Sequence, residues 1–157
     1  MILKAKTTMT TKNHDWVLNI EEMHDKYGVH SWVSKKLAEG DFDTLKEFLK
    51  FRISFLEEEL AETKKAVDNK DPEEIVDGLI DLCVVAIGTL DAFKVNSYEA
   101  WTEVHNANMA KEVGVKASRP NKLGLPDLIK PEDWTPPSHE DNYGILQRIF
   151  NVSSDDV

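Results

Sequence analysis

The sequence has a single cysteine, no long uncharged apolar run and no signal-peptide pattern at its start. Cys83 cannot form a disulfide within one chain, and its apolar neighbours indicate a small core residue. The most apolar stretch, 79–93, is interrupted by Asp81 and Asp91, so it falls short of the roughly 18 uncharged residues of a membrane span. The opening residues lack the apolar segment that precedes a signal cleavage site. We therefore expect a cytoplasmic protein that does not enter a membrane.

Basic side chains are also in short supply. There are 19 Lys and Arg against 29 Asp and Glu, which gives a formal net charge of −10. This imbalance argues against a nucleic-acid partner, because contact with a phosphate backbone needs clustered positive charge. The sequence also has no glycine-rich phosphate loop, no Ser-His-Asp arrangement and no zinc-spaced cysteines. A chain of 157 residues is expected to form its own core, so a bound metal would serve chemistry.

The sequence does contain helical periodicity throughout, with no competing strand pattern. Asp71 followed by Pro72 is typical of a helix start, and Asn96 with Glu99 resembles a capping box. Asp41 or Asp43 is expected to cap the helix before these. We predict an all-α helical bundle with helices at about 16–27, 31–37, 43–68, 72–93, 96–114 and 143–150.

Proline is concentrated in one segment, because every proline except Pro72 lies between 115 and 139. Proline breaks both helix and sheet, which indicates an ordered loop or a flexible arm there. The expected organisation is therefore a flexible lead-in at 1–14, a helical catalytic domain at 15–114, a Pro-rich basic arm at 115–142, and a short helix with an acidic tail at 143–157.

The first long helix carries carboxylates where apolar residues are expected. At about 100° per residue, Glu59 and Glu62 fall on the same side as the apolar positions. Glu57 points the opposite way, and Glu58 lies at the edge. The alternative is a solvated acidic face whose glutamates pair with the lysines that follow.

The next helix repeats this pattern, because Asp77 and Asp81 are one turn apart in an otherwise apolar segment. Four converging buried carboxylates raise one another's pKa and require a positive partner. A divalent cation meets this need, and a set of oxygen ligands without His or Cys suits Mg²⁺, with Mn²⁺ as a possible substitute.

A basic group complements these acids. Lys111, Lys116, Arg119 and Lys122 occur with only Glu112 among them. An anionic ligand such as a nucleoside triphosphate with its Mg²⁺ is expected to bridge the acidic and basic regions. The alternative is a loop with ordinary surface lysines that packs on a neighbouring subunit. A separate Glu21-x-x-His24 step is half of a di-iron pattern that needs two copies, so we expect His24 to have a packing or surface role.

Three ordered segments, Glu58–Glu62, Asp77–Asp81 and Val104–Lys111, resemble the MazG-like all-α nucleoside triphosphate pyrophosphohydrolases. The closer resemblance, over about 43–137, is to the bacteriophage-encoded branch that is similar to phosphoribosyl-ATP pyrophosphohydrolase. It implies a helical bundle assembled as a homotetramer or, second, a homodimer. It also implies hydrolysis of NTP to NMP and pyrophosphate with Mg²⁺ held by the glutamate pair and by acids on the following helix. A phage-encoded chain would act in the host cytoplasm.

The resemblance also implies roles for individual residues. Asn108 and Lys111 would face the nucleotide, and Lys130 with Pro136 and Pro137 matches a C-terminal arm. Much of the superfamily has an acid three residues before Asp81, where this chain has Gly78. We expect the following roles: Glu59, Glu62 and Asp81 as metal ligands with Asp77 assisting, Glu58 as base or as ligand through water, Glu59 also as a catalytic residue, and Asn108, Lys111, Lys116, Arg119, Lys122 and Lys130 as substrate-binding residues.

Standard deoxynucleotides are the substrates expected by analogy with phage enzymes. Two other functions remain open. One is a pyrophosphohydrolase acting on a phosphoribosyl nucleotide. The other is a non-catalytic acidic helical module that binds a host protein.

Overall fold

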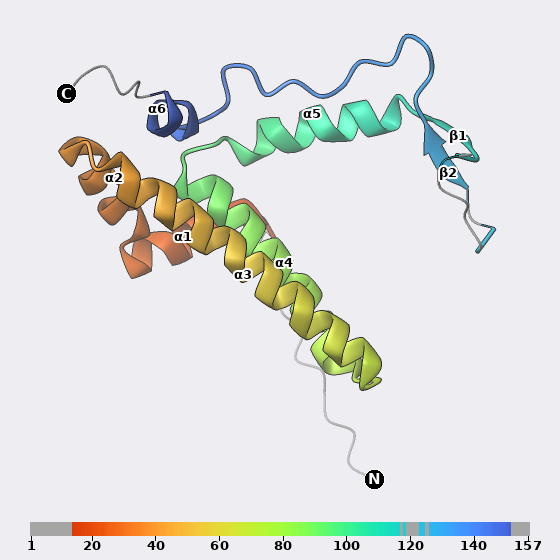
Figure 1. The fold of residues 1–157 in the computed structure, drawn as a ribbon, viewed down its shortest axis with the longest axis horizontal. Coiled ribbons are helices and arrows are strands. Elements are labelled where there is room, and N and C mark those ends of the chain that lie inside the picture. The colour runs from red at the N-terminus through yellow and green to blue at the C-terminus, as the bar shows by residue number, and fades with distance from the viewer. Residues whose placement is uncertain (1–13, 117, 119–122, 125, 152–157) are drawn as a thin grey trace.

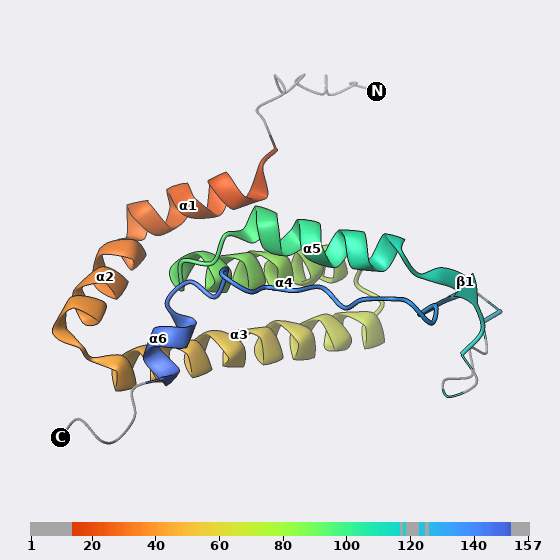
Figure 2. The same cartoon turned by 90° about the horizontal axis from the view of Figure 1, so that it is seen from above.

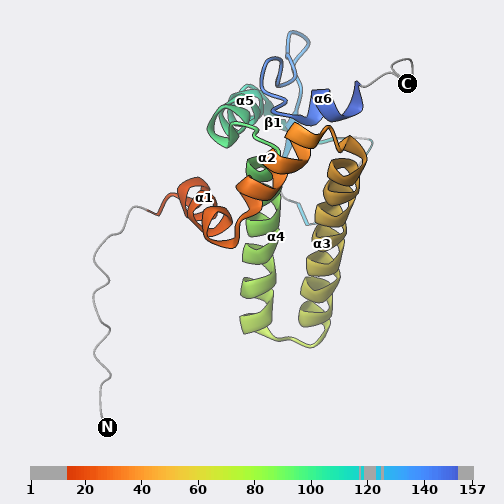
Figure 3. The ribbon, with the colours of Figure 1, turned by 90° about the vertical axis from the view of Figure 1, so that its left-hand side faces the viewer.

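The structure is a computed structural model that describes residues 14–116, 118, 123, 124 and 126–151. Its centre is a hairpin of two long antiparallel helices, α3 (Phe42–Asp68) and α4 (Pro72–Ala92). Two shorter helices, α1 (Trp16–Tyr27) and α2 (Val29–Glu39), pack against one end of this hairpin (Figures 1 and 3). The mostly helical structure agrees with the predicted all-α class. No helix in the described ranges is long and apolar enough to cross a membrane.

The helix starts follow the predicted capping residues. The Asp71 carboxylate accepts hydrogen bonds from the backbone N–H groups of Glu73 and Glu74, and Pro72 occupies the first turn. Asp41, rather than Asp43, caps α3. These caps satisfy N–H groups that have no partner within the helix, so the chain can reverse sharply between α3 and α4.

Helix α5 (Ser97–Met109) begins with only half of the expected capping box. The Asn96 side chain accepts from the N–H groups of Tyr98 and Glu99. The N–H group of Asn96 does not bond to Glu99; it donates to the side chain of Asn142 at 2.8 Å. The start of α5 therefore holds the C-terminal segment in place.

A second contact joins α5 to the N-terminal helix. The Tyr98 hydroxyl donates to the carboxylate of Asp15, the residue that caps α1, at 2.7 Å. This hydrogen bond is the main reason that the pKa of Tyr98 rises to about 12. Tyr98 consequently stays protonated, and remains a donor, at physiological pH.

The core lies at one end of the hairpin. Its fully buried members are Val33, Leu45, Phe93 and Ile149, the last from the short helix α6 (Leu146–Phe150). Over the opposite half of the hairpin, apolar side chains such as Leu60, Val76 and Leu79 are not covered by another helix of the described part of the chain and are exposed. The predicted acidic residues lie in this less covered half.

Two short strands follow α5, although the sequence shows no strand pattern. Strands β1 (Glu112–Gly114) and β2 (Asp127–Ile129) pair antiparallel. The fifth predicted helix therefore ends at Met109 and not at Gly114. The Ile129 side chain lies against Gly114, so a larger residue at position 114 would force that side chain to move. A strand of three residues is too short to show the alternation of polar and apolar side chains that reveals strands in a sequence. The pair of β1 and β2 also joins the predicted helical domain to the predicted arm.

From β2 the chain returns along α5 in the opposite direction and ends in α6 (Figure 2). This returning segment, residues 130–142, is the C-terminal part of the predicted arm at 115–142. The Trp134 ring N–H donates to the Ala107 carbonyl at 2.7 Å, and the Ser138 N–H donates to Glu103 at 3.4 Å. Two further hydrogen bonds, at 2.8 and 2.9 Å, join the Asn142 side chain to the backbone of Asn96, the N-cap of α5. The arm is thus a strap docked on α5, while the predicted lead-in falls almost entirely outside the described residues.

Candidate metal and nucleotide site

Helices α3 and α4 approach closely at Thr63 and Gly78, both of which are buried. A Cβ at position 78 would collide with the Thr63 hydroxyl and lie 3.3 Å from the Thr63 Cβ. An acidic side chain at position 78 therefore does not fit. This explains in physical terms why the chain departs from the common spacing and carries its acid at Asp77 instead.

Four carboxylates flank this contact: Glu59 and Glu62 from α3, and Asp77 and Asp81 from α4. We call them the acidic quartet. The pKa of Glu59 is raised, first by burial and then by the negative charges of Asp81, Glu62, Glu58 and Asp77. The hairpin therefore brings the four predicted metal ligands, with Glu58, into one negatively charged region.

No positive side chain neutralises this region within the described part of the chain. The ion pairs there involve other acids, and neither Lys64 nor Lys65 pairs with the glutamates that precede them. The described side chains therefore form no ion pairs across this acidic region, and a solvated acidic face stays open as the alternative to a metal site.

The quartet is more open than the sequence indicates. Glu59 and Asp81 are half-buried, as predicted, but Glu62 and Asp77 are exposed. Among the described side chains, no three members of the quartet place ligand oxygens within 4.8 Å of one another. The prediction that all four lie inside is wrong for a single chain because no helix covers the Leu79 side of α4.

The predicted substrate-binding residues gather around a tryptophan. The Lys111 ammonium donates to the Asn108 side chain at 2.8 Å. The ammonium groups of Lys111 and Lys130 lie 5.4 and 4.4 Å from the centre of the Trp134 ring. Sequence analysis missed Trp134, although an aromatic residue four positions after Lys130 in a proline-rich segment was an available signal.

Lys116 does not join this group; it lies 3.9 Å from Asp127, on the partner strand β2. Arg119 and Lys122 lie outside the described residues. In Figure 1 the Met109 end of α5, with strands β1 and β2, projects away from the loop that joins α3 to α4. Among the residues that the structure describes, no ion pair or hydrogen bond joins Asn108, Lys111, Lys116 or Lys130 to the acidic quartet of the same chain.

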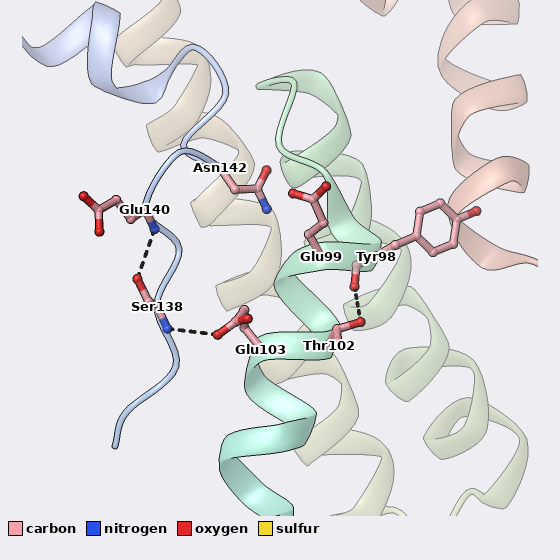
Figure 4. Close-up of a pocket in the computed structure, with 7 residues that line it drawn as sticks. All are labelled: Tyr98, Glu99, Thr102, Glu103, Ser138, Glu140 and Asn142. Carbon is pink, nitrogen blue, oxygen red and sulfur yellow. Dashed lines mark hydrogen bonds between the residues drawn. The ribbon is translucent and has the colours of Figure 1, made fainter. Parts of the chain in front are cut away.

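A cavity of about 370 Å³ lies between α5 and the strap (Figure 4). Three of its lining residues are the glutamates Glu99, Glu103 and Glu140. A negatively charged lining repels a triphosphate, and the quartet is not part of this cavity. It is therefore not the site at which a nucleotide would meet the metal.

The family model described as phosphoribosyl-ATP pyrophosphohydrolase matches residues 32–108, about half of the chain. This match begins in α2, ends in α5 and contains the whole quartet. Residues 32–108 belong to this family. The comparison with curated proteins finds no match. The match agrees with the family drawn from the three sequence motifs and assigns this segment to the pyrophosphohydrolases, while the bacteriophage branch stays a prediction.

The contact at Gly78 leads to a stability prediction within this family fold. Gly78→Ala should gain roughly 0.5–1 kcal/mol from helix propensity. It should lose about 1–3 kcal/mol by overpacking against Thr63, so urea unfolding is expected to show a net loss of stability. A Thr63→Ala/Gly78→Ala double variant should lose less stability than the sum of the losses of the two single variants, because the shorter side chain at position 63 leaves room for the new methyl group. A Gly78→Ala protein that is more stable than wild type would contradict the close approach.

Proposed function

We propose that the chain is a Mg²⁺-dependent nucleoside triphosphate pyrophosphohydrolase that converts a (d)NTP and water into the (d)NMP and pyrophosphate, with standard deoxynucleotides preferred. The observation that supports this most strongly is the acidic quartet, four carboxylates without a cationic partner at the contact between two helices of the family segment. An all-oxygen donor set of this charge suits Mg²⁺, with Mn²⁺ as a substitute.

In this proposal Glu59, Glu62 and Asp81 hold the metal, and Asp77 assists. The exposed side chains of Glu62 and Asp77 are free to turn toward the half-buried Glu59 and Asp81. When bound, Mg²⁺ neutralises triphosphate oxygens and lowers the pKa of a coordinated water. The reaction forms a bond between the water oxygen and the α-phosphorus and breaks the bond from that phosphorus to the bridging oxygen, which leaves with pyrophosphate. Glu58, exposed beside the quartet, accepts the water proton or binds through a water molecule.

The group around Trp134 supplies the opposite charge. Lys111, Lys130 and the Asn108 amide bind the nucleotide in this proposal, with Lys116, Arg119 and Lys122 reinforcing the positive charge. Since no described contact joins this group to the quartet of its own chain, it would contact the nucleotide held by the quartet of another subunit. A single oligomeric site would then combine acids and bases from two chains.

The exposed apolar surface favours such an assembly. Leu79 on α4 is 51% exposed and Trp101 on α5 is 73% exposed. Patches of this kind mark protein interfaces more often than free surface. We predict that light scattering returns the mass of a homotetramer, with a dimer as the second choice, and that Trp101→Glu lowers it. A wild-type mass of 17.9 kDa at micromolar concentration would refute the shared site.

The strap predicts a substrate-affinity effect at Trp134. Trp134→Leu removes the hydrogen bond to Ala107 and two cation–π contacts, each worth about 0.5–1 kcal/mol. We expect roughly a tenfold higher KM and a smaller change in kcat, measured by pyrophosphate release. Tyr27→Leu is the matched control, because Tyr27 is an exposed aromatic on α1 that also has a lysine over its ring. An unchanged KM for Trp134→Leu would exclude this role of the strap.

The second candidate is phosphoribosyl-ATP as substrate, which the description of the matching family favours. A panel of NTPs, dNTPs and phosphoribosyl-ATP, each incubated with the protein and Mg²⁺ and separated by chromatography, tests both. Fastest release of pyrophosphate from dNTPs supports the first candidate. Exclusive turnover of phosphoribosyl-ATP supports the second. No turnover of any substrate would favour the non-catalytic acidic module that binds a host protein.

A further inference from the structure

A second group of metal-ligating side chains lies where α1 and α2 pack on the last turns of α4. His24 Nδ1 and His30 Nε2 each lie 2.6 Å from the same carboxylate oxygen of Asp91. Within the ranges that the structure describes, these residues form the one set of three whose ligand atoms all lie within 4.8 Å of one another. Asp91 and the two histidines are 67 and 61 positions apart, so packing of the helices, and not proximity in sequence, brings them together.

This group is partly buried, unlike an ordinary surface cluster. The side chains of His24, Asp91 and His30 are 3%, 12% and 30% exposed. A carboxylate at this depth is costly unless it is paired with positive charge. The nearby Arg52 guanidinium donates to the Val85 carbonyl and the Thr89 hydroxyl, so it does not serve Asp91. The positive charge that compensates the Asp91 carboxylate must therefore come from the two histidines or from an ion bound between them and Asp91.

A fourth residue orients one of the histidines as in known metal sites. His30 Nδ1 lies 2.6 Å from the carboxylate of Asp25, on the side of the ring opposite Asp91. Histidine ligands of metals almost always donate their other ring N–H to a carboxylate, a carbonyl or water, which fixes the tautomer. If Asp25 holds the proton on Nδ1, loss of the Nε2 proton to solvent leaves that nitrogen able to bind a metal in place of its hydrogen bond to Asp91.

We propose that His24, His30 and Asp91 bind a transition-metal dication, Zn²⁺ preferred, at a site separate from the acidic quartet. Two imidazole nitrogens and one carboxylate oxygen form a ligand set typical of Zn²⁺ with a water in fourth position, whereas Mg²⁺ prefers oxygen alone. Around such an ion the ligand atoms sit roughly 3.3 Å apart, so the side chains separate by less than about 1 Å as coordination replaces the two hydrogen bonds.

The position of the site assigns it a structural role. Asp91 is ten residues beyond Asp81 on α4, about 15 Å along the helix axis, and lies outside the region of the quartet. His24, Asp25 and His30 all precede residue 32, where the family match begins, while Asp91 lies inside that match. The ion therefore fastens α1, which lies outside the matched segment, and the first turn of α2 onto α4 of the hairpin.

Titration of Co²⁺ into metal-free full-length protein tests this site directly. We expect one equivalent per chain to give the strong visible absorption of four-coordinate Co²⁺, and Zn²⁺ to displace it. His30→Gln should weaken this binding at least 100-fold, and Asp25→Asn about 10- to 100-fold. His14→Gln, at an exposed histidine just before α1, is the matched control and should bind normally.

Asp81→Asn separates the two sites, because it should leave the strong absorption intact and remove only weaker six-coordinate binding at the quartet. Circular dichroism checks the fold of each variant. If His30→Gln is misfolded, Asp25→Asn decides, since the Asp25 side chain is 73% exposed and its replacement leaves the core intact. Absence of the four-coordinate signal, its persistence at full strength in folded His30→Gln or Asp25→Asn, or its loss in Asp81→Asn would overturn the proposal.

Discussion

Replacing Asp81 by asparagine is expected to lower Mg²⁺-dependent pyrophosphate release by about a thousandfold or more. Asparagine keeps the shape of the side chain but removes one charge from the quartet, and a metal ion in such a site contributes several kcal/mol to catalysis. Without metal, the melting temperature should be equal to or higher than that of wild type. The reason is that one of the charges that raise the pKa of Glu59 has gone.

Glu57→Gln is the matched control for Asp81→Asn. Glu57 lies on α3 close to the quartet in sequence, but it is exposed and is not among the charges that shift the pKa of Glu59. Its replacement should change stability by no more than about ±0.5 kcal/mol and leave turnover unchanged. Pyrophosphate release and metal-free melting curves for both variants suffice. An active Asp81→Asn, or an inactive but folded Glu57→Gln, would mean that the metal ligands have been assigned to the wrong face of the helices.

Removal of divalent ions is expected to abolish activity without unfolding the protein. The core of Val33, Leu45, Phe93 and Ile149 contains no metal-ligating side chain, so it should persist in chelator. The helical circular dichroism signal in EDTA should fall by no more than the signal that the 12 residues of α1 and the first turn of α2 contribute, because the histidine site fastens only these parts to the hairpin. Added Mg²⁺ should raise the melting temperature by mass action.

Readdition of Mg²⁺ alone should restore turnover after chelation, because the histidine site is structural. If turnover recovered only after Zn²⁺ was added, the histidine site would take part in catalysis. Loss of all helical signal in EDTA would show that an ion is needed for the fold.

The helices were predictable because their signals are local. The Asp71-Pro72 pair acts on the N–H groups of the next turn, so its effect is readable from neighbouring residues. Asn96 shows the limit of such reasoning: its side chain caps α5 as predicted, but its N–H group bonds to Asn142, 46 residues away. Local sequence does not reveal which distant group competes for a donor.

The site was predictable as a set of residues but not as a geometry. Helical spacing places Glu59 and Glu62 on one side of α3, yet it cannot say whether another helix covers that side. In the structure Glu59 is half-buried and Glu62 is exposed, a difference that the spacing alone does not predict. The same limit hid the contact of Asp91 with His24 and His30, which depends on how α1 and α2 pack on α4. The reason for Gly78 emerged only when its neighbour Thr63 was located.

The most direct test of the proposed reaction is ³¹P NMR of a deoxynucleoside triphosphate mixed with the full-length protein, followed as Mg²⁺ is added. We expect no change before Mg²⁺. After its addition, the signals of the monophosphate and of pyrophosphate should grow in equal amounts, because water attacks the α-phosphorus. Asp81→Asn recorded in parallel should leave the triphosphate intact. Formation of the diphosphate with inorganic phosphate, or equal turnover with and without Mg²⁺, would contradict pyrophosphohydrolysis at the acidic quartet.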